Sequence, residues 1–404
     1  MNNNKKKSWT KPRHRLVRHI AAALLSPIVR FKYRAKVTRF REDKKRQYLI
    51  LFNHQTAFDQ FFVGLAFRQP VYYIASEDLF SKGFLSSLIR FLVAPIPIRK
   101  QTTDVRAVLN CIKVAKEGGT IALAPEGNRT FSGRTGYMNP AVAALSRKLG
   151  LPILLFRIEG GYGAQPRWSD VIRRGNMRCY VSRVIEPEEY GEWDNERLLS
   201  EICRELYLDE GGVGEAFRHK RRAEFLERAI YVCPECGLSR FESHGALMSC
   251  KGCGLTVEYG EDKRITAVKG ALPFGTVAEW YGYQCGFVNR LDPRELSEEA
   301  LYSDLTELSE VIVYKKKKRI AKRAQVLLFG DRIALRYGDT ETDLPFDEVG
   351  AITVLGRNKL NLYHRDRIYQ LKGDKRFNAL RHLNIFHRYK NVTGGKENDE
   401  FLGL

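Results

Sequence analysis

The sequence predicts an α/β domain with a mostly parallel mixed sheet, then a small cysteine-rich module, then a β-rich, barrel-like domain capped by a helix. Three observations predict this order. Short apolar runs alternate with amphipathic stretches up to about residue 210. Two close pairs of cysteines follow, and short segments separated by turn residues fill the last part of the chain. A length of 404 residues also exceeds one ordinary core.

The first segment, residues 1–40, is predicted to form a basic amphipathic helix in a membrane interface. Apolar residues recur at helical spacing from Leu16 to Phe31, and arginines lie beside that stripe. The chain has 68 Lys and Arg against 47 Asp and Glu, a formal net charge of +21. Charge alone indicates an anionic partner, either lipid or nucleic acid. A helix packed on the protein's own core is the alternative.

No apolar stretch of the sequence reaches the roughly 18–20 residues that span a bilayer. The run from Ile20 to Val29 is interrupted by Ser26 and Pro27, and no cleavage signal follows it. Four of the eight cysteines are scattered among apolar neighbours, which is not a secreted disulfide framework. We therefore expect a cytoplasmic protein bound peripherally to the inner face of the cell membrane.

Residues 41–210 alternate between short apolar runs and amphipathic stretches, which predicts βα units with much parallel pairing. A continuous apolar run such as 48–52 is typical of a strand buried on both faces. Strands are expected at 48–52, 71–74, 96–98, 120–123 and 153–158, and helices at 61–67, 84–93, 105–117, 142–148 and 197–207.

His54 stands at the exit of the first predicted strand, and Asp59 follows it five residues later. A lone histidine beside a strand is more often structural. The strand-to-helix turn, however, can bring the Asp59 carboxylate to the imidazole, where it fixes the tautomer and raises the basicity. This pair suits acyl transfer without a protein nucleophile, in which a hydroxyl deprotonated by His54 attacks a thioester carbonyl.

A second polar group follows another predicted strand and could hold phosphate. Glu126 and Gly127 form a rigid turn with exposed amides, and Arg129 can contact phosphate oxygens in a bidentate manner. Arg99 and Lys100 add positive charge at the exit of a neighbouring strand. Open α/β sheets bind ligands at the carboxyl ends of their strands, where all these groups fall. A salt-bridged surface turn is the alternative.

The order of these motifs resembles the glycerolphosphate and lysophosphatidate acyltransferase family. Its four blocks match residues 53–59, 95–99, 124–130 and 151–156, within a resemblance that covers about residues 20–210. The resemblance implies transfer of a fatty acyl group from acyl-CoA or acyl carrier protein to a lysophosphatidate-like acceptor in phospholipid synthesis. It also implies that His54 is the base and Asp59 its partner. In the same family pattern, the acceptor phosphate site is built by Arg99, Glu126, Gly127 and Arg129.

Two departures from the family pattern bear on the acceptor. Met138-Asn139-Pro140 stands where family members usually carry Lys and Gly, and residues 155–163 replace an apolar, Pro-containing strand. Another lysophospholipid or a glycolipid therefore stays open as acceptor. A non-catalytic adaptor that binds membrane or nucleic acid is the alternative of another class. The presence of both His54 and Asp59 argues against it, because a binding module needs no base with its orienter.

Two Cys-x2-Cys-Gly knuckles predict a structural Zn²⁺ site in a zinc ribbon over residues 229–262, after a linker at 211–228. The predicted ligands are Cys233, Cys236, Cys250 and Cys253. Four sulfurs fill a tetrahedral site, so no position is left for catalysis. A redox Cys-x-x-Cys is the alternative, but it would not require a second pair. The ribbon's surroundings are acidic, so nucleic acid is not the expected partner.

The C-terminal part is predicted to contain a connecting helical segment at 263–305, a pleckstrin-homology-like β-rich domain at 306–392 and a flexible tail at 393–404. Its basic run from Lys315 to Arg319 is interpreted either as a second phospholipid contact or as a solvated face. Strands are expected at 311–314, 325–329, 333–337, 351–354, 359–364 and 367–371, and a helix at 377–389.

Overall fold

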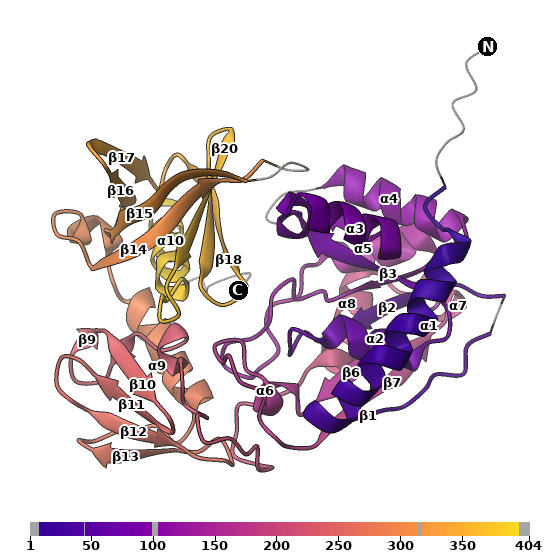
Figure 1. Ribbon diagram of the computed structural model, residues 1–404, viewed down its shortest axis with the longest axis horizontal. Helices are drawn as coiled ribbons and strands as arrows, with labels where there is room; N and C mark the ends of the chain where they lie inside the picture. Colours follow the sequence, from indigo (N-terminus) through magenta and orange to yellow (C-terminus); the bar gives the residue numbers. More distant parts are fainter. Residues whose placement is uncertain (1–7, 44, 99–103, 313–316, 396–404) are drawn as a thin grey trace. The chain divides into compact units, whose positions relative to one another are not determined.

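The computed structural model describes residues 8–43, 45–98, 104–312 and 317–395 of the protein (Figure 1). The chain divides into two compact units whose sequences interleave. The first unit consists of Met1–Arg129, Thr135–Ala164 and Asn176–Leu208. The second unit consists of Thr130–Arg134, Gln165–Gly175 and Asp209–Leu404.

The first unit is built on a seven-stranded sheet with the order β1-β7-β6-β2-β5-β3-β4. Only the β6–β7 pair is antiparallel, so the predicted mostly parallel mixed sheet is confirmed. The central strand β2 is buried at every position, as its continuous apolar run indicated. The strands are β1 Ala35–Val37, β2 Leu49–Phe52, β3 Val71–Ser76, β4 Ile96–Ile98, β5 Thr120–Leu123, β6 Ile153–Glu159 and β7 Met177–Ile185.

Helices α2, α3, α4, α5 and α8 of the first unit match the predicted ones closely, whereas the short helices α6 and α7 were not predicted. Leu49 and Leu51 point to the same face of the sheet, where they share a core with Val114, Val142 and Ile202 from three helices. Each buried aliphatic side chain of this kind contributes about 1.5–3 kcal/mol. The helices are α2 Asp59–Ala66, α3 Phe84–Val93, α4 Val105–Lys116, α5 Ala141–Leu149, α6 Gly161–Ala164, α7 Pro187–Gly191 and α8 Asn195–Leu206.

The N-terminal segment is not one helix up to residue 40. Helix α1 (Pro12–Pro27) continues as a π-helical turn over Ile28–Lys32, and the chain then enters the sheet as β1. Strand β1 pairs in parallel with β7, a strand that the sequence analysis did not predict. The change from helix to strand occurs at Tyr33, whose ring is fully buried and packs against the rings of Phe58 and Phe62. Within the described residues, no helix combines the length and apolar character needed to cross a membrane.

The cysteine-rich part of the second unit contains the short pair β8–β9 and a four-stranded antiparallel sheet. The expected boundary at residue 262 falls inside this sheet, because β12 and β13 are joined by a tight turn there. Helical structure in the 263–305 segment begins only at α9 (Val277–Asn289), which has a capping box between Thr276 and Glu279. The strands are β8 Val232–Cys233, β9 Gly237–Leu238, β10 Phe241–His244, β11 Leu247–Cys250, β12 Thr256–Tyr259 and β13 Ile265–Lys269.

The rest of the second unit is a curled, seven-stranded antiparallel sheet followed by helix α10 (Leu380–Thr393). Its order is β17-β16-β15-β14-β20-β19-β18, so the first strand lies between the second and the last. This is the strand-rich, helix-capped arrangement that the sequence predicts. The strands are β14 Tyr302–Glu310, β15 Lys318–Leu328, β16 Arg332–Tyr337, β17 Thr340–Pro345, β18 Val349–Leu355, β19 Lys359–His364 and β20 Arg367–Gly373.

Three predictions for this part need correction. The strand expected at 311–314 is wrong in its described residues, because β14 ends at Glu310. Residues 313–316, which include Lys315 and Lys316 of the basic run, lie outside the described residues. Strand β17 was not predicted. The segment 211–228, predicted as a linker, is packed, since Phe217, Ala223 and Leu226 are buried. One hydrophobic core joins the cysteine-rich sheet, α9, the curled sheet and α10.

Candidate active site

His54 and Asp59 are in contact at the carboxyl end of β2. The Nδ1 atom of His54 lies 2.7 Å from Oδ2 of Asp59, and the imidazole is 27% exposed while the carboxylate is fully buried. A carboxylate can only accept, so Nδ1 carries the proton and donates it, and Nε2 holds the lone pair. The geometry thus gives the histidine the tautomer that a general base needs at Nε2.

The Asp59 carboxylate is held by the turn between β2 and α2. It accepts hydrogen bonds from the backbone N–H of Gln55 at 2.7 Å and of Thr56 at 2.8 Å, and from the Thr56 hydroxyl at 2.7 Å. Asp59 is also the first residue of α2, where the helix dipole favours negative charge. The side chain therefore has one orientation, and it fixes the imidazole ring in turn.

Two contacts that the sequence did not reveal fix the same turn to β6 and to the short helix α6 that follows it. The Asn53 amide, fully buried, donates to the carbonyl of Ile158 at 2.9 Å and accepts from its N–H at 2.8 Å. Gly161 packs so closely that a Cβ there would lie 2.5 Å from the Cβ of Gln55. Gly161, one of the glycines that depart from the family pattern after β6, therefore has a packing reason.

Glu126 links the histidine turn to the loop after β5. Its carboxyl group is buried and accepts from the N–H of His54 at 2.7 Å and from the N–H of Gly136 at 3.0 Å. Burial raises the pKa of Glu126 to about 8, although the two N–H donors favour the charged form. The structure therefore gives Glu126 a positioning role that the sequence did not reveal; its predicted contact with the acceptor stays a prediction.

The other predicted phosphate-site residues lie at the same edge of the sheet where they are described. Gly127 has φ +66°, a left-handed conformation that favours glycine, and its N–H closes the turn on the carbonyl of Ala124 at 3.0 Å. Arg129 is partly buried. Arg99 and Lys100 follow β4 but lie outside the described residues.

The segment that replaces the family's Lys and Gly has a local structural role. Met138 is buried, and the side chain of Asn139 accepts from the N–H of Ala141 at 2.9 Å at the start of α5. This stretch therefore supplies packing and a helix start. It gives no cation at the position where family members usually carry a lysine.

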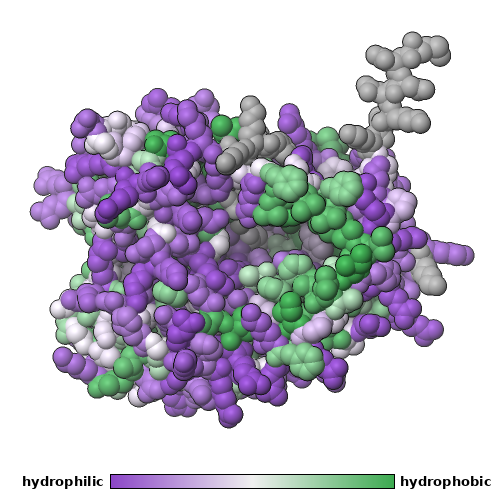
Figure 2. Space-filling model, viewed as in Figure 1, coloured by the Kyte–Doolittle hydropathy of each residue, from purple (hydrophilic) through white to green (hydrophobic). Residues whose placement is uncertain are grey.

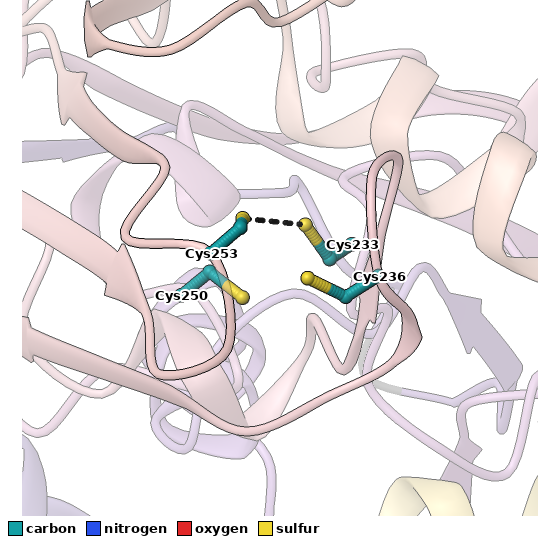
Figure 3. A group of neighbouring side chains, drawn as sticks. All are labelled: Cys233, Cys236, Cys250 and Cys253. Carbon is teal, nitrogen blue, oxygen red and sulfur yellow. Dashed lines mark hydrogen bonds between the residues drawn. The ribbon is translucent and has the colours of Figure 1, made fainter.

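The four paired cysteines form a second candidate site, within the second unit (Figure 3). Their sulfur atoms all lie within 4.8 Å of one another and point to a common centre. The sulfurs of Cys233 and Cys253 are 3.7 Å apart, close to the roughly 3.8 Å between ligands of a tetrahedral site with Zn–S bonds of about 2.3 Å. The four residues are therefore able to hold a metal ion.

The knuckle backbone supports this donor set. The N–H groups of Glu235 and Cys236 donate to the Cys233 sulfur, and those of Gly252 and Cys253 donate to the Cys250 sulfur. A Cβ at Gly252 would lie 3.0 Å from the sulfur of Cys236, so this glycine keeps space for the cluster. Backbone N–H groups aimed at thiolates are the outer shell that metal sites use.

Comparisons with known proteins show what a part of the first unit is similar to. Residues 30–158 match the family model described as acyltransferase, a range that includes His54, Asp59, Glu126 and Arg129. This part of the chain is thus similar to an acyltransferase domain, as the motif order predicts.

Particular relatives are 1-acyl-sn-glycerol-3-phosphate acyltransferases. The chloroplastic protein of Brassica napus is 22% identical over 135 residues, which cover 33% of this chain and 39% of that protein. The protein of Borreliella burgdorferi is 24% identical over 166 residues, 39% of this chain and 64% of that protein. The chain thus spans less than two thirds of these relatives. The crystal structure of PlsC from Thermotoga maritima, a 1-acyl-sn-glycerophosphate acyltransferase, aligns with a TM-score of 0.39 and 21% identity, over 48% of this chain and 76% of that chain.

Proposed function

We propose that the protein is an O-acyltransferase. It moves a fatty acyl group from a thioester, acyl-CoA or acyl carrier protein, to the hydroxyl of a lysophosphatidate-like acceptor. The observation that carries the proposal is the 2.7 Å contact between His54 and Asp59 at the carboxyl end of β2, inside the range that matches the acyltransferase family. The relatives, which are 1-acyl-sn-glycerol-3-phosphate acyltransferases, support this acceptor class.

The proposed reaction needs no covalent intermediate on the protein. The Nε2 atom of His54 takes the proton of the acceptor hydroxyl, whose oxygen attacks the thioester carbonyl carbon. The C–O bond forms, the C–S bond breaks, and the imidazolium returns the proton to the departing thiolate sulfur. Asp59 stabilises the imidazolium between these two transfers. A positioned general base of this kind contributes about 10²–10⁴ in rate.

Arg129 is proposed to bind the acceptor phosphate, with the amide-exposing turn at Gly127 and with Arg99 and Lys100. A guanidinium matches two phosphate oxygens at once, which gives both attraction and orientation. The segment at 138–140 supplies no lysine here, so another lysophospholipid or a glycolipid stays as the second acceptor class.

An acyl-transfer assay with purified protein, acyl-CoA or acyl carrier protein and a panel of lysolipids tests the reaction. His54→Ala should lose at least about a hundredfold in turnover, whereas His244→Ala, an exposed histidine of the second unit, should not. The proposal fails if no acceptor is acylated or if His54→Ala is as active as the wild type. Tight duplex binding at physiological salt would instead support the adaptor.

The first unit is proposed to dock on the inner face of the cell membrane through an apolar ridge, defined here as the exposed apolar side chains of α1, its π-helical end and α3. The two helices are side by side, because the indole N–H of Trp9 donates to the carbonyl of Ala94 and Arg13 donates to that of Phe91. Figure 2 shows hydrophobic side chains gathered over these elements. The most exposed are Leu16 at 63%, Leu24 at 69%, Phe31 at 71% and Phe84 at 83%.

This face combines the two contributions that peripheral proteins use. Exposed apolar side chains enter the headgroup boundary, and nearby lysines and arginines add about 1 kcal/mol each at an anionic surface. The opposite side of α1 packs on the unit, where His14 is buried and contacts the Tyr72 hydroxyl at 3.0 Å. The core-packing alternative therefore holds for the face of α1 around His14, and the interfacial contact is proposed for its exposed face.

The four-cysteine cluster is proposed to hold a structural Zn²⁺. The ion would cross-link the β8–β9 turn to the β11–β12 turn, and four thiolates would leave it no site for substrate. Metal analysis of the purified protein should give one zinc per chain, and Cys250→Ser should lower that ratio and the thermal stability. A protein that is metal-free as purified and equally stable with a chelator would contradict this assignment. Cys285→Ser, outside the cluster, is the control.

A further inference from the structure

We infer that the first unit has a second anion-binding site, a pocket at the base of the N-terminal helix that binds the phosphate of an anionic lipid headgroup in a membrane. The pocket is an open cavity of about 590 Å³ between the end of α1, β1 and α2. Four of the side chains that line it are cationic, and we call them the basic pocket: Arg30, Arg34, Lys36 and Arg39.

The basic pocket lacks a counter-charge of its own. The other residues that line it are apolar or neutral, such as Ser26 and Asn176, with no acid among them. Among the described residues, none of the four cations forms an ion pair, although most arginines of the second unit do. Four like charges around one cavity repel one another, so an anion that enters it relieves this repulsion.

The basic pocket lies at the same edge of the sheet as His54 but several strands away. Ala35, which lines the pocket, pairs with Met177 at the start of β7. The start of β7 pairs with the carboxyl end of β6. The carboxyl end of β6 in turn pairs with the carboxyl end of β2, which His54 follows. Three strand spacings separate β1 from β2, which is about 14 Å. The pocket is thus on the proposed catalytic edge, too far away to be the phosphate site beside His54.

The occupant is the phosphate of a bilayer lipid, because the pocket continues into the apolar ridge. Phe31 follows Arg30 directly and Ile28 precedes it by two residues; they are 71% and 37% exposed, and Leu24 is one turn before Ile28. A ligand that meets cations and exposed apolar side chains together is amphipathic. A freely diffusing phosphate ion would use only the cations. The inference rests on the membrane docking proposed above and adds the headgroup class.

Vesicle binding tests the site with a matched control. The variant R30Q/R34Q/K36Q/R39Q removes the basic pocket, and the control K45Q/K116Q/K148Q/R197Q removes four exposed cations from the opposite edge of the sheet. The pocket variant should bind phosphatidylglycerol vesicles at least about a hundredfold more weakly than wild type, with phosphatidylcholine binding unchanged. The control should lose less than about tenfold. Equal losses in the two variants would overturn the inference.

Four further measurements distinguish a lipid headgroup from free phosphate, and failure of the pocket from failure of the proposed enzyme. Arg30→Lys, Arg34→Lys and Arg39→Lys together should retain vesicle binding, and all variants should unfold at the wild-type temperature. Inorganic phosphate, at the concentration of lipid phosphate near the vesicle surface, should not displace the protein from the vesicles. Displacement would show that the pocket binds free phosphate and would overturn the assignment to a lipid. Turnover of a monodisperse short-chain lysophosphatidate should be unchanged in the pocket variant. If the wild type is inactive but still binds phosphatidylglycerol vesicles more tightly than phosphatidylcholine vesicles, the proposed acyltransferase activity is refuted and the lipid site is retained.

Discussion

Replacing Glu126 by glutamine tests the link between the histidine turn and the loop after β5. The buried carboxyl group accepts from the N–H groups of His54 and Gly136, and burial raises its pKa from 4.5 to about 8. A folded state with the higher pKa binds the proton more tightly than the unfolded chain does. Glutamine has no such proton, and its NH₂ group leaves one of the two N–H donors without an acceptor.

The size and sign of the effect follow from these values. The difference of 8 − 4.5 corresponds to on the order of 5 kcal/mol at about 1.36 kcal/mol per pKa unit. Because the folded-state pKa is raised, this stabilisation is complete below pH 4.5 and is lost as the pH rises towards 8. The stability of the wild type relative to Glu126→Gln should therefore fall by several kcal/mol between pH 5 and 8.

Hydrogen exchange of the segment 49–59, corrected for the intrinsic rate at each pH, measures this stability difference locally. A local measurement is needed because a chain with two units need not unfold in one transition. Glu117→Gln is the matched control of opposite sign. Partial burial raises the pKa of Glu117, but hydrogen bonds donated by Thr10, Ser8 and Trp9 lower it, and the net shift is downward. The stabilisation that the Glu117 carboxylate gives is therefore present above pH 4.5 and is lost on acidification. The reasoning would be refuted if the stability of the segment 49–59 changed equally with pH in the wild type and in Glu126→Gln between pH 5 and 8.

Asp59→Asn should lower turnover by about 10²–10⁴ with little change in KM, because the amide no longer fixes the Nδ1–H tautomer; a KM effect alone would contradict this. Gly161→Ala should destabilise the first unit by about 1–3 kcal/mol in urea unfolding, since its Cβ has no space, whereas Gly191→Ala, with open space around it, should be neutral. Phe31→Ser with Phe84→Ser should weaken binding to neutral as well as anionic vesicles, unlike loss of the basic pocket; unchanged partition would exclude the apolar ridge as the contact.

The sequence predicted the elements of the first unit where one physical signal dominates. Strands such as β2 are continuous apolar runs because helices and neighbouring strands cover them, and the amphipathic helices have their ordinary period. Strand β1 is too short for a period, and β7 alternates apolar residues with Arg178 and Ser182 in a half-exposed position. Strand β1 was missed because of its length, and β7 because the prediction followed continuous apolar runs and not this alternation.

The candidate active site was predictable only in its local part. His54 and Asp59 are five residues apart, so the turn between them carries the signal. Glu126 reaches the N–H of His54 across 72 residues, and Asn53 reaches Ile158 across 105. Contacts of this kind depend on which strands become neighbours, and no spacing in the sequence reports that. The basic pocket was hidden likewise, since its cations face one cavity only after β1 joins the sheet.

The interleaving of the two units has a consequence for the order in which the chain is made. Between β6 and β7 the chain leaves the first unit, and residues 165–175 join the second, where Arg167 donates to the carbonyl of Val354 and Arg228 to that of Trp168. A ribosome that has completed β7 has not yet made these partners. The indole of Trp168, which is buried in the folded protein, therefore lacks its packing partners until the last part of the chain has been synthesised. A fragment cut after residue 208 would keep that indole exposed, so neither unit can be separated by a single cleavage.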